Sequence, residues 1–481
     1  AGGEGPDGPD GDEPAALLGL ARFAMAEEAV AEGLARLVAT ARQWGDEASV
    51  QGVGAAAGLD ESQLRAVLAA VRHGVSVLTG GPGTGKSRTV AAVVEHARRR
   101  RKRVALAAPT GRAAKRLEEL AGEPATTLHR LLGAQGTTGE FLRGEDWPLD
   151  ADLVVVDEAS MLDAELAAAL VEACDDGTHL LVVGDPAQLP SIGAGRVLGD
   201  LVDAGAVPVA ELTTLYRQAE GGAIARLATA VRAGELPPVD DPHREVVVVR
   251  ARDAGEAAHR SVQLVTDSIP RALGIPPDDV QVVTPVHRGP AGTTELNRVL
   301  KARLNPGQGQ VGGFDVGDRV VATANHMPPA AGGQDADAGP GFANGEVGVV
   351  TGLQDGGLVV TFPAGPVTVP ASALGDLRHG WAITVHRAQG SEWPAVVAVV
   401  PGEAAGMLSR PLVYTGFTRA RRHLSVVHAA GPALARAVRD VGARPRRTRL
   451  RGLLREEVGA VSPAGSRLVG VGGTVRGDPD D

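Results

Sequence analysis

Residues 75–90 read VSVLTGGPGTGKSRTV, an apolar run followed by a glycine-rich loop and the start of a helical pattern. The loop Gly80–Ser87 matches G-x-x-x-x-G-K-[ST], and apolar residues at helical spacing follow it. In this strand–loop–helix arrangement, backbone N–H groups and the helix N-terminus bind phosphates. Lys86 is expected to reach the β- and γ-phosphates, and the Ser87 hydroxyl to ligate Mg²⁺. The stretch therefore predicts a nucleoside triphosphate site.

Short β-branched runs alternate with helical patterns on both sides of the loop. This alternation predicts an α/β fold with parallel sheets that are covered by helices on both faces. The expected strands are Val75–Thr79, Val104–Ala108, Leu153–Val156 and Leu180–Val183 in a first set, and Val246–Arg250, Val280–Thr284, Ala395–Val400 and Leu424–His428 in a second. Within the second set, residues 311–375 hold short strand-like runs separated by Gly, Pro and Asp, which predicts an inserted all-β module.

Two further strand ends carry polar residues suited to nucleotide chemistry. The run LVVVDE ends in Asp157 and Glu158. Asp157 is expected to hold Mg²⁺ beside Ser87, mostly through water, and Glu158 to polarise the attacking water. The run HLLVVGDPAQ ends the next strand, where Gln188 is expected to orient the water and Asp185 to support the metal shell. The sequence thus predicts a hydrolytic phosphate site.

The composition limits the classes of protein to which the chain can belong. Of its 481 residues, 43% are apolar and 22% charged, close to the globular average. No apolar run approaches 18 residues, so a membrane-spanning helix is not expected. The single cysteine, Cys174, cannot form an intrachain disulfide, and a cytoplasmic location is expected. The net charge of −10 argues against a uniformly basic surface but leaves room for a local basic channel.

The patterns divide the chain into two α/β units, the first interrupted by a β-hairpin and the second by the all-β module. The expected bounds are 1–14 for a disordered acidic tail, 15–58 for N-terminal helices and a linker, 59–205 for the first unit with the hairpin at about 134–150, 206–310 and 376–455 for the second unit, 311–375 for the inserted module, and 456–481 for a flexible C-terminal tail.

Motifs in a fixed order along the chain extend this interpretation. They are LDESQ at 59–63, GGPGTGKS at 80–87, APTGRAAKR at 108–116, the segments 154–162 and 184–195, LYRQ at 215–218, WAITVHRAQGSE at 381–392 and VYTGFTRAR at 413–421. With these motifs the chain resembles the superfamily-one DNA helicases, in particular the RecD-like branch of the B-type, which moves 5′ to 3′. The resemblance covers about residues 15–455. It implies two RecA-like P-loop domains, a small Src-homology-like β-barrel and a hairpin that acts as a pin splitting the duplex.

The resemblance also implies a role for each matched residue. ATP and Mg²⁺ are the implied cofactors, and Arg217 and Arg419 are implied to reach the γ-phosphate from the second domain. The residues implied to bind the nucleotide are Gln63 at the adenine edge, then Gly81, Pro82, Gly83, Thr84, Gly85, Lys86, Ser87 and Arg88 in and after the loop, and Gln389, Gly390 and Glu392 across the cleft. The implied contacts to single-stranded DNA are Thr110, Arg112, Thr126, His129, Thr384 and His386.

The biological setting stays open at this point. Single-stranded and forked DNA are the expected partners, with recombination or repair proteins as further candidates, and a monomer is expected. One alternative is a RecD-type subunit of a RecBCD-like nuclease complex, and another is an ATP-gated single-strand translocase that does not unwind by itself. Of the N-terminal extension found in longer family members, only the last helices are recognised, at about 15–43. The basic run Arg444–Arg451 is expected to lie near DNA.

Overall fold

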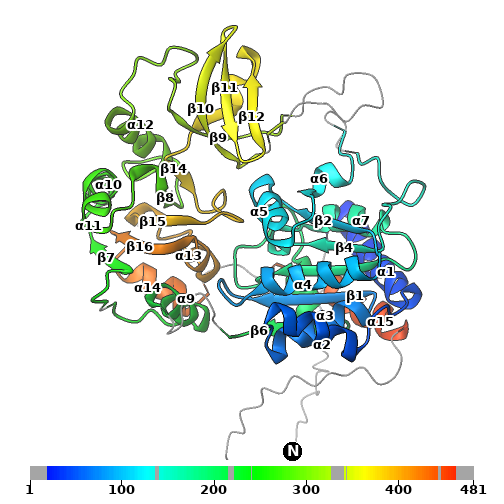
Figure 1. Cartoon of the computed structure of the whole chain (residues 1–481). Helices are drawn as coiled ribbons and strands as arrows, with labels where there is room; N and C mark the ends of the chain where they lie inside the picture. Colours follow the sequence, from blue (N-terminus) through cyan, green and yellow to red (C-terminus); the bar gives the residue numbers. More distant parts are fainter. Residues whose placement is uncertain are drawn as a thin grey trace, which may run out of the picture.

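The computed structural model describes residues 19–135, 140–214, 222–239, 241–326, 341–342, 344–441 and 446–461. Within these ranges the chain forms two parallel sheets flanked by helices, side by side, and a smaller antiparallel sheet next to the second of them (Figure 1). No helix in the described ranges is both long enough and apolar enough to span a membrane.

The first parallel sheet carries the phosphate-binding loop. Its strands, in spatial order, are β3 (Ala125–Thr127), β2 (Val104–Ala108), β4 (Leu153–Val156), β5 (His179–Gly184), β1 (Val75–Gly80) and β6 (Val209–Leu212). All neighbouring strands pair in parallel. Because parallel strands end at the same edge, the loops after β1, β4 and β5 meet there, where open α/β sheets bind ligands.

Alternate residues of the central strands face two separate helical layers. The helices of this unit are α1 (Ala21–Thr40), α2 (Glu47–Ala57), α3 (Glu61–Arg72), α4 (Lys86–Arg99), α5 (Gly111–Ala121), α6 (Leu128–Leu131), α7 (Ala164–Glu172), α8 (Val197–Ala204) and α15 (Leu450–Val461), with the 3-10 turn η1 (Ala159–Met161). Val154 and Val156 pack in a core with α1, α7, α8 and α15, whereas Leu153 and Val155 pack in a core with α2, α3, α4 and α5. Burial on both faces explains the unbroken apolar runs of these strands.

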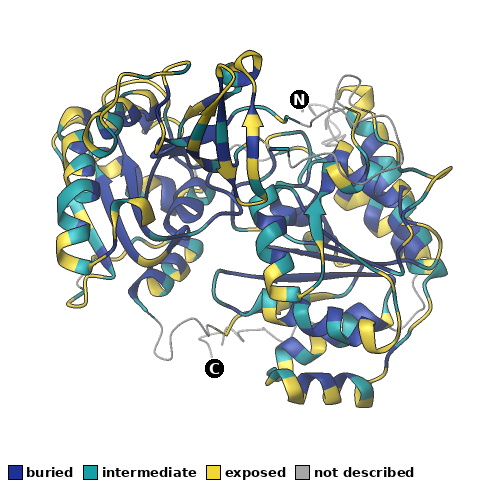
Figure 2. Cartoon of the chain, turned by 45° about the horizontal axis from the view of Figure 1, so that its top comes forward, coloured by how far each residue is buried: buried dark blue, intermediate teal, exposed yellow. Residues whose placement is uncertain are grey.

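The second parallel sheet is built in the same way. Its strands, in spatial order, are β14 (Ala382–Thr384), β8 (Val280–Thr284), β15 (Trp393–Val400), β16 (Ala420–His428) and β7 (Val246–Arg250). Its helical elements are α9 (Ala223–Ala233), α10 (Ala254–Gln263), the π-helical η2 (Leu264–Ser268), α11 (Ile269–Leu273), η3 (Pro277–Asp279), α12 (Thr293–Leu304), η5 (Gly402–Ala404), α13 (Arg410–Phe417) and α14 (Pro432–Arg439). Figure 2 shows that buried residues concentrate in the strands of both sheets, beneath helices with exposed outer faces.

The antiparallel sheet has its own hydrophobic core. Its strands are β12 (Gly365–Val369), β11 (Gly357–Phe362), β10 (Val347–Gln354), β9 (Arg319–Ala322) and β13 (Leu377–His379), with the 3-10 helix η4 (Ala371–Asp376) between β12 and β13. Lys301 of α12 lies 2.6 Å from both Asp315 and Asp318 at the start of this segment. The hydrogen bond from Lys301 holds the pKa of Asp315 down at about 2. This ion-paired cluster ties the antiparallel sheet to the second unit.

The structure differs from the sequence expectations in four places. The inserted module, expected at 311–375, extends further, because β13 pairs with β9 in the antiparallel sheet. Residues 47–57, expected in a linker, form α2, because Asp46 and Ser49 make a capping box. The short strands β3, β6 and β14 were not predicted, since three or four residues carry little periodicity, and β6 places residues after 205 in the first sheet. Helix α15 packs on the first unit, although residues up to 455 were expected in the second unit and 456–461 in a tail. Its residues Leu450, Leu454 and Val458 form one fully buried row on α15.

Candidate functional site

Glycines give the phosphate-binding loop its shape, and the ammonium group of Lys86 lies against the loop's own carbonyls. Gly83 and Gly85 have φ angles of +79° and +86°, a region that glycine adopts without strain. Lys86 Nζ donates to the carbonyl oxygens of Gly80 (2.6 Å) and Gly81 (3.1 Å). The ammonium group is therefore held over the loop, where a bound phosphate has to compete with these carbonyls for it.

A cavity of about 180 Å³ opens beside the loop and is lined by both units. Gly81, Pro82 and Thr84 line it from the first unit, and Tyr414 and Arg421 line it from the second. The predicted nucleotide ligands of the loop thus face residues of the second sheet.

Asp157 and Glu158 follow β4 at the same edge of the sheet. The N–H of Glu158 donates to Asp157 Oδ1 (2.8 Å), and Glu158 adopts a left-handed φ of +54°. Burial raises the pKa of both carboxyl groups, and the charge of Asp157 raises that of Glu158 further. Lys86 and Arg116 oppose both shifts, and Arg419 opposes that of Glu158. The result is a half-buried acidic pair that lies close to cations from both units.

Gln188 and Arg419 meet across the two units. Arg419 Nη2 donates to Gln188 Oε1 at 3.1 Å. The rest of the guanidinium is fixed by the carbonyls of Thr415 (2.9 Å) and Ser391 (3.2 Å), and Arg419 is only 2% exposed. The residue predicted to orient the attacking water and the residue predicted to reach the γ-phosphate are therefore in direct contact.

The loop after β5 makes three further hydrogen bonds to the second unit. Tyr414 donates its hydroxyl to Asp185 Oδ2 (2.7 Å), the N–H of Leu189 donates to Thr415 Oγ1 (2.8 Å), and Gln389 Nε2 donates to the carbonyl of Leu189 (2.7 Å). Burial and the neighbouring carboxylate of Asp185 raise the pKa of Tyr414. The carboxylate of Asp185 binds Tyr414 in this structure, and its predicted support of the metal shell stays a prediction.

Glu392 and Gly390 also contact the first unit. The carboxylate of Glu392 lies 3.2 Å from Arg116 and 3.0 Å from Arg421, and its side chain is 7% exposed. A Cβ on Gly390 would lie 3.1 Å from Thr110 Oγ1, and Gly390 has a φ of +69°. These residues hold the two units together here, and their contact with nucleotide stays a prediction.

Two predicted nucleotide ligands have protein partners. Gln63 Oε1 accepts the N–H of Asp60 (3.1 Å) in a capping box that begins α3. Its Nε2 is buried and has no hydrogen-bond partner in the described part of the chain, which leaves one amide donor for a ligand. Arg88 donates to the carbonyls of Ala57 (2.9 Å) and Gly58 (2.5 Å), so its guanidinium binds the C-terminal end of α2. Arg217 lies outside the described residues.

The predicted DNA contacts of the first unit lie at β2, β3 and the helices that follow them. Thr110 caps α5 by accepting a backbone N–H with its hydroxyl. Arg112 packs over the ring of Trp393 (4.7 Å to the centroid), and burial lowers its pKa to about 10. Thr126 lies in β3, and His129 lies in α6, where burial lowers the pKa of its imidazole. Arg112 therefore serves the contact between the units in this structure.

The predicted DNA contacts of the second unit lie beside a basic cavity. Thr384 lines a cavity of about 510 Å³ together with His287, Arg378 and Arg387. His386 follows in the same turn, and burial, aided by the charge of His287, lowers its pKa. Sequence reasoning assigned no role to Arg378 or Arg387, although Arg387 directly follows His386 in a quoted motif.

The basic run Arg444–Arg451 does not present all its arginines to a ligand. Arg446 donates to carbonyls of the loop that follows Gln188, and Arg449 pairs with Glu28 (2.7 Å). These two guanidinium groups have protein partners, and the proximity of the run to DNA stays a prediction.

Comparison with known proteins agrees with this geometry. A family model described as an AAA domain matches residues 58–252, and one described as a UvrD-like helicase C-terminal domain matches residues 379–427. The two matches cover the phosphate-binding unit and the segment that contributes Gln389 and Arg419. The fold and site thus define a P-loop ATPase of the helicase type.

Curated relatives specify the family. The ATP-dependent RecD2 DNA helicase of Deinococcus radiodurans is 41% identical over 368 residues, covering 76% of this chain and 48% of that protein. The RecBCD enzyme subunit RecD of Mycolicibacterium smegmatis is 36% identical over 479 residues, covering 89% of this chain and 82% of the relative. The RecD subunit of Mycobacterium tuberculosis is 37% identical over 449 residues, covering 81% and 73%. The chain belongs to the RecD family of ATP-dependent DNA helicases, and it spans about half the length of the Deinococcus relative.

Among solved structures, a similar chain occurs in a structure that concerns DNA unwinding at forked double-stranded DNA by two coordinating Pif1 helicases. It has a TM-score of 0.48 and 18% identity, and the match covers 77% of this chain and 92% of that chain. A Bacteroides Pif1 bound to single-stranded DNA has a TM-score of 0.46 and 18% identity, with the same coverage.

Proposed function

We propose that this chain couples ATP hydrolysis to 5′-to-3′ movement along single-stranded DNA and unwinds duplex DNA, in repair or recombination. The observation that carries the proposal is the contact between Gln188 and Arg419 across the two units. A γ-phosphate bound at this contact would couple the nucleotide state to the relative position of the units, and hydrolysis would release it. Domain movement driven in this way is what a DNA translocase requires.

The chemistry assigned to each residue follows from its position. Lys86 binds the β- and γ-phosphates, and Glu158 polarises the water that attacks the γ-phosphorus as ADP leaves. Arg419 stabilises the charge that develops on the transferred oxygens, with Gln188 orienting the water. Arg217 is proposed to assist Arg419.

Ser87 and Asp157 fit Mg²⁺, which would neutralise phosphate charge when bound. Asp157 is half-buried, and the charges of Lys86 and Arg116 act on its carboxylate. No group of three or more His, Cys, Asp and Glu side chains suited to a metal occurs in the described ranges. This agrees with Mg²⁺ at phosphate sites, which takes one or two protein ligands and completes its shell with phosphates and water. For the base, we propose that the unpartnered Nε2 of Gln63 donates to adenine.

The DNA is proposed to cross both units on the side of Thr110, Thr126 and His129 in the first and of Thr384 and His386 in the second. The cavity that Arg387 and Thr384 line supplies cations and hydroxyls, which bind phosphates without reading sequence. Arg112 would reach the strand only after the units separate, because it is now engaged with Trp393.

Two accessory elements complete the proposal. Ala134 pairs with Phe141 and Gly144 with Trp147 in isolated antiparallel bridges, which supports a hairpin that acts as a pin at the duplex junction. Residues 136–139, at the expected turn, lie outside the described residues. The five-stranded antiparallel sheet is proposed to close into a small Src-homology-like barrel that helps to hold DNA. We further propose a monomer that works on single-stranded and forked DNA in the bacterial cytoplasm.

A second candidate is a RecD-type subunit that acts within a RecBCD-like complex. It is favoured by the mycobacterial RecD subunits, of which this chain covers 82% and 73%. In that case the chain would hydrolyse ATP on DNA but would need partner subunits to unwind it.

Strand displacement with ATP separates these candidates. Two duplexes are compared, one with a 5′ single-stranded overhang and one with a 3′ overhang, and ATP hydrolysis is measured in the same reactions. Lys86→Ala serves as the inactive control. Unwinding from the 5′ overhang alone is the expected result. ATP hydrolysis without unwinding would favour the subunit or a translocase, and unwinding only from the 3′ overhang would overturn the proposed polarity.

A further inference from the structure

The loop 185–195, which carries Gln188, is held from two sides by parts of the chain that are distant in sequence. Its first half contacts the second unit through Asp185, Gln188 and Leu189. Its second half is held by Arg446, about 250 residues further along the chain. The loop is therefore held by the second unit on one side and by Arg446 on the other.

Arg446 binds four acceptors of this loop with one guanidinium group. Nη1 donates to Ser191 Oγ (3.1 Å) and to the carbonyls of Gly193 and Gly195 (2.6 Å each), and Nη2 donates to the carbonyl of Ser191. Only arginine has enough N–H donors in a rigid plane to satisfy a curved row of carbonyls of this kind. Between these acceptors, Ile192 is 84% exposed, so burial of an apolar side chain does not fix this half of the loop, whereas Leu189 in the first half is buried in the core of the second unit.

The segment 446–461 that carries Arg446 is bound to the first unit although it follows the last helix of the second. α15 buries Leu450, Leu454 and Val458 against α1 and α8, and the N–H of Arg449 donates to Glu27 (2.9 Å). Further along α15, Arg455 donates to the carbonyls of Ala204 (3.1 Å) and Asp203 (2.9 Å), at the end of α8.

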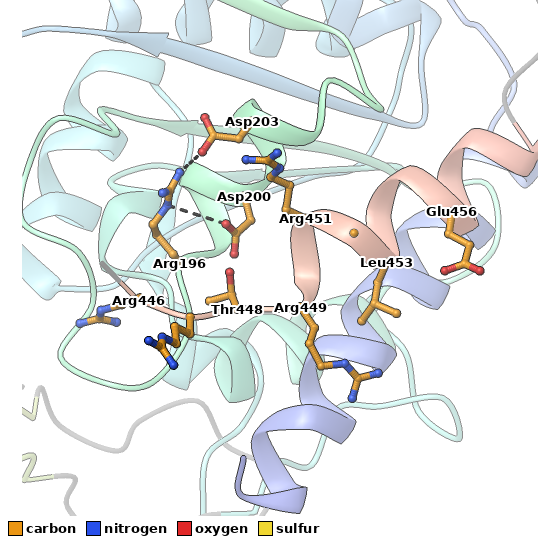
Figure 3. A pocket seen from close by; sticks show the side chains of 11 residues that line it. Arg196, Asp200, Asp203, Arg446, Thr448, Arg449, Arg451, Leu453 and Glu456 are labelled. Carbon is orange, nitrogen blue, oxygen red and sulfur yellow. Dashed lines mark hydrogen bonds and ion pairs between the residues drawn. The ribbon is translucent and has the colours of Figure 1, made fainter. Parts of the chain in front are cut away.

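The start of this segment and α8 line a surface cavity of about 860 Å³. In Figure 3, Arg196 reaches Asp200 and Asp203 of α8, and Thr448 of the segment lies beside Asp200. The second half of the loop is held by the hydrogen bonds of Arg446 and by the N–H of Ala164, which donates to the carbonyl of Ala194 (2.9 Å).

We propose that Arg446 is a positioning residue for ATP hydrolysis: it holds the loop 185–195 so that Gln188 stays aligned with Arg419 and with the attacking water. The proposal rests on the proposed function and deepens it. Arg446 touches neither nucleotide nor DNA in this role. Its loss should leave ATP binding intact while it slows turnover, because the loop can then drift away from the hydrolysis site.

The test is steady-state ATP hydrolysis with saturating oligodeoxythymidylate for the wild type, Arg446→Ala, Arg446→Lys and Arg455→Ala. Arg455→Ala is the matched control, because it removes the same kind of arginine–carbonyl contact from the same segment without touching the loop. Melting temperatures are measured in parallel. Arg446→Ala is expected to lower kcat by about 10- to 100-fold with an almost unchanged KM for ATP, since small misplacements of reacting groups cost up to about 100-fold. The kcat of Arg446→Lys should lie between those of the wild type and Arg446→Ala, and Arg455→Ala should keep the wild-type kcat.

Equal kcat values for Arg446→Ala and Arg455→Ala would overturn the positioning role, as would a rise in KM without a fall in kcat. If Arg446→Ala does not fold, Arg446→Lys carries the comparison, and a kcat equal to that of Arg455→Ala would overturn the role. A wild-type chain without DNA-stimulated hydrolysis would instead contradict the proposed function.

Discussion

The two parallel sheets have the same architecture but present very different residues at the edges that face each other. The first sheet offers Lys86, Asp157 and Glu158, and partial desolvation raises the pKa of the two carboxyl groups. The second sheet offers Arg419 and Gln389, whose polar atoms already bind the loop after β5 or nearby carbonyls. The carboxyl groups at the first edge are therefore partly desolvated, whereas the polar side chains at the second edge already make hydrogen bonds.

This difference separates the work of the two units. Carboxyl groups whose pKa is raised by desolvation are typical of groups that act on a bound substrate. Side chains that are already hydrogen-bonded across a domain boundary can report a change by exchanging partners. We infer that the first unit binds ATP and activates the attacking water, and that Arg419 of the second unit completes the site only when the two units are in contact.

The largest effect is expected from the first unit. Lys86→Ala should lower ATP turnover by about 10³-fold or more, because it removes the cation that binds the β- and γ-phosphates. The check is phosphate release with DNA present, with Lys102→Ala as a control at a lysine whose ammonium pairs with Asp152 away from the loop. Substantial turnover in Lys86→Ala would mean that the phosphate site has been misplaced.

A variant of the second unit is expected to lose about as much rate as Lys86→Ala but to keep its affinity for nucleotide. Arg419→Ala should lower kcat by about 10³-fold, the effect of removing an arginine that stabilises the transition state. Nucleotide affinity, measured by binding of a fluorescent ATP analogue, should stay close to that of the wild type. If affinity falls while kcat does not, Arg419 belongs to the binding site and the division between the units fails.

The smallest effect concerns stability and its dependence on pH. Burial raises the folded-state pKa of Glu158, so the folded state binds more protons than the unfolded state and stability falls as pH rises through that pKa. Glu158→Gln removes the buried charge and should raise the melting temperature at neutral pH, with a gain that shrinks as the pH is lowered. Melting curves between pH 8 and about pH 4 check this expectation. The lower limit is near the ordinary pKa of glutamate.

Glu165→Gln is the control for this series, because the side chain of Glu165 is 52% exposed. Its melting temperature should differ little from the wild type at any pH. A Glu158→Gln variant that is less stable than the wild type at neutral pH would show that the carboxylate is stabilised rather than strained.

The local features of the site were predictable from the sequence. The strand, the phosphate loop and the start of the helix lie within sixteen consecutive residues, and the strands that precede Asp157 and Asp185 follow from apolar runs. Their meeting at one edge follows from parallel pairing alone. The order of motifs was sufficient to indicate the family, which the relatives confirm.

Contacts between distant segments were decided only by the tertiary structure. No local pattern pairs Gln188 with Arg419, turns Asp185 toward Tyr414, or returns α15 to the first unit. In the sequence, the arginines of 444–451 form a basic patch. In the structure, Arg446 donates its hydrogen bonds to carbonyls of a loop about 250 residues away. The physical reason is that a side chain's charge and periodicity are set by its own residue and its neighbours, whereas its partners depend on how separate helices and sheets pack.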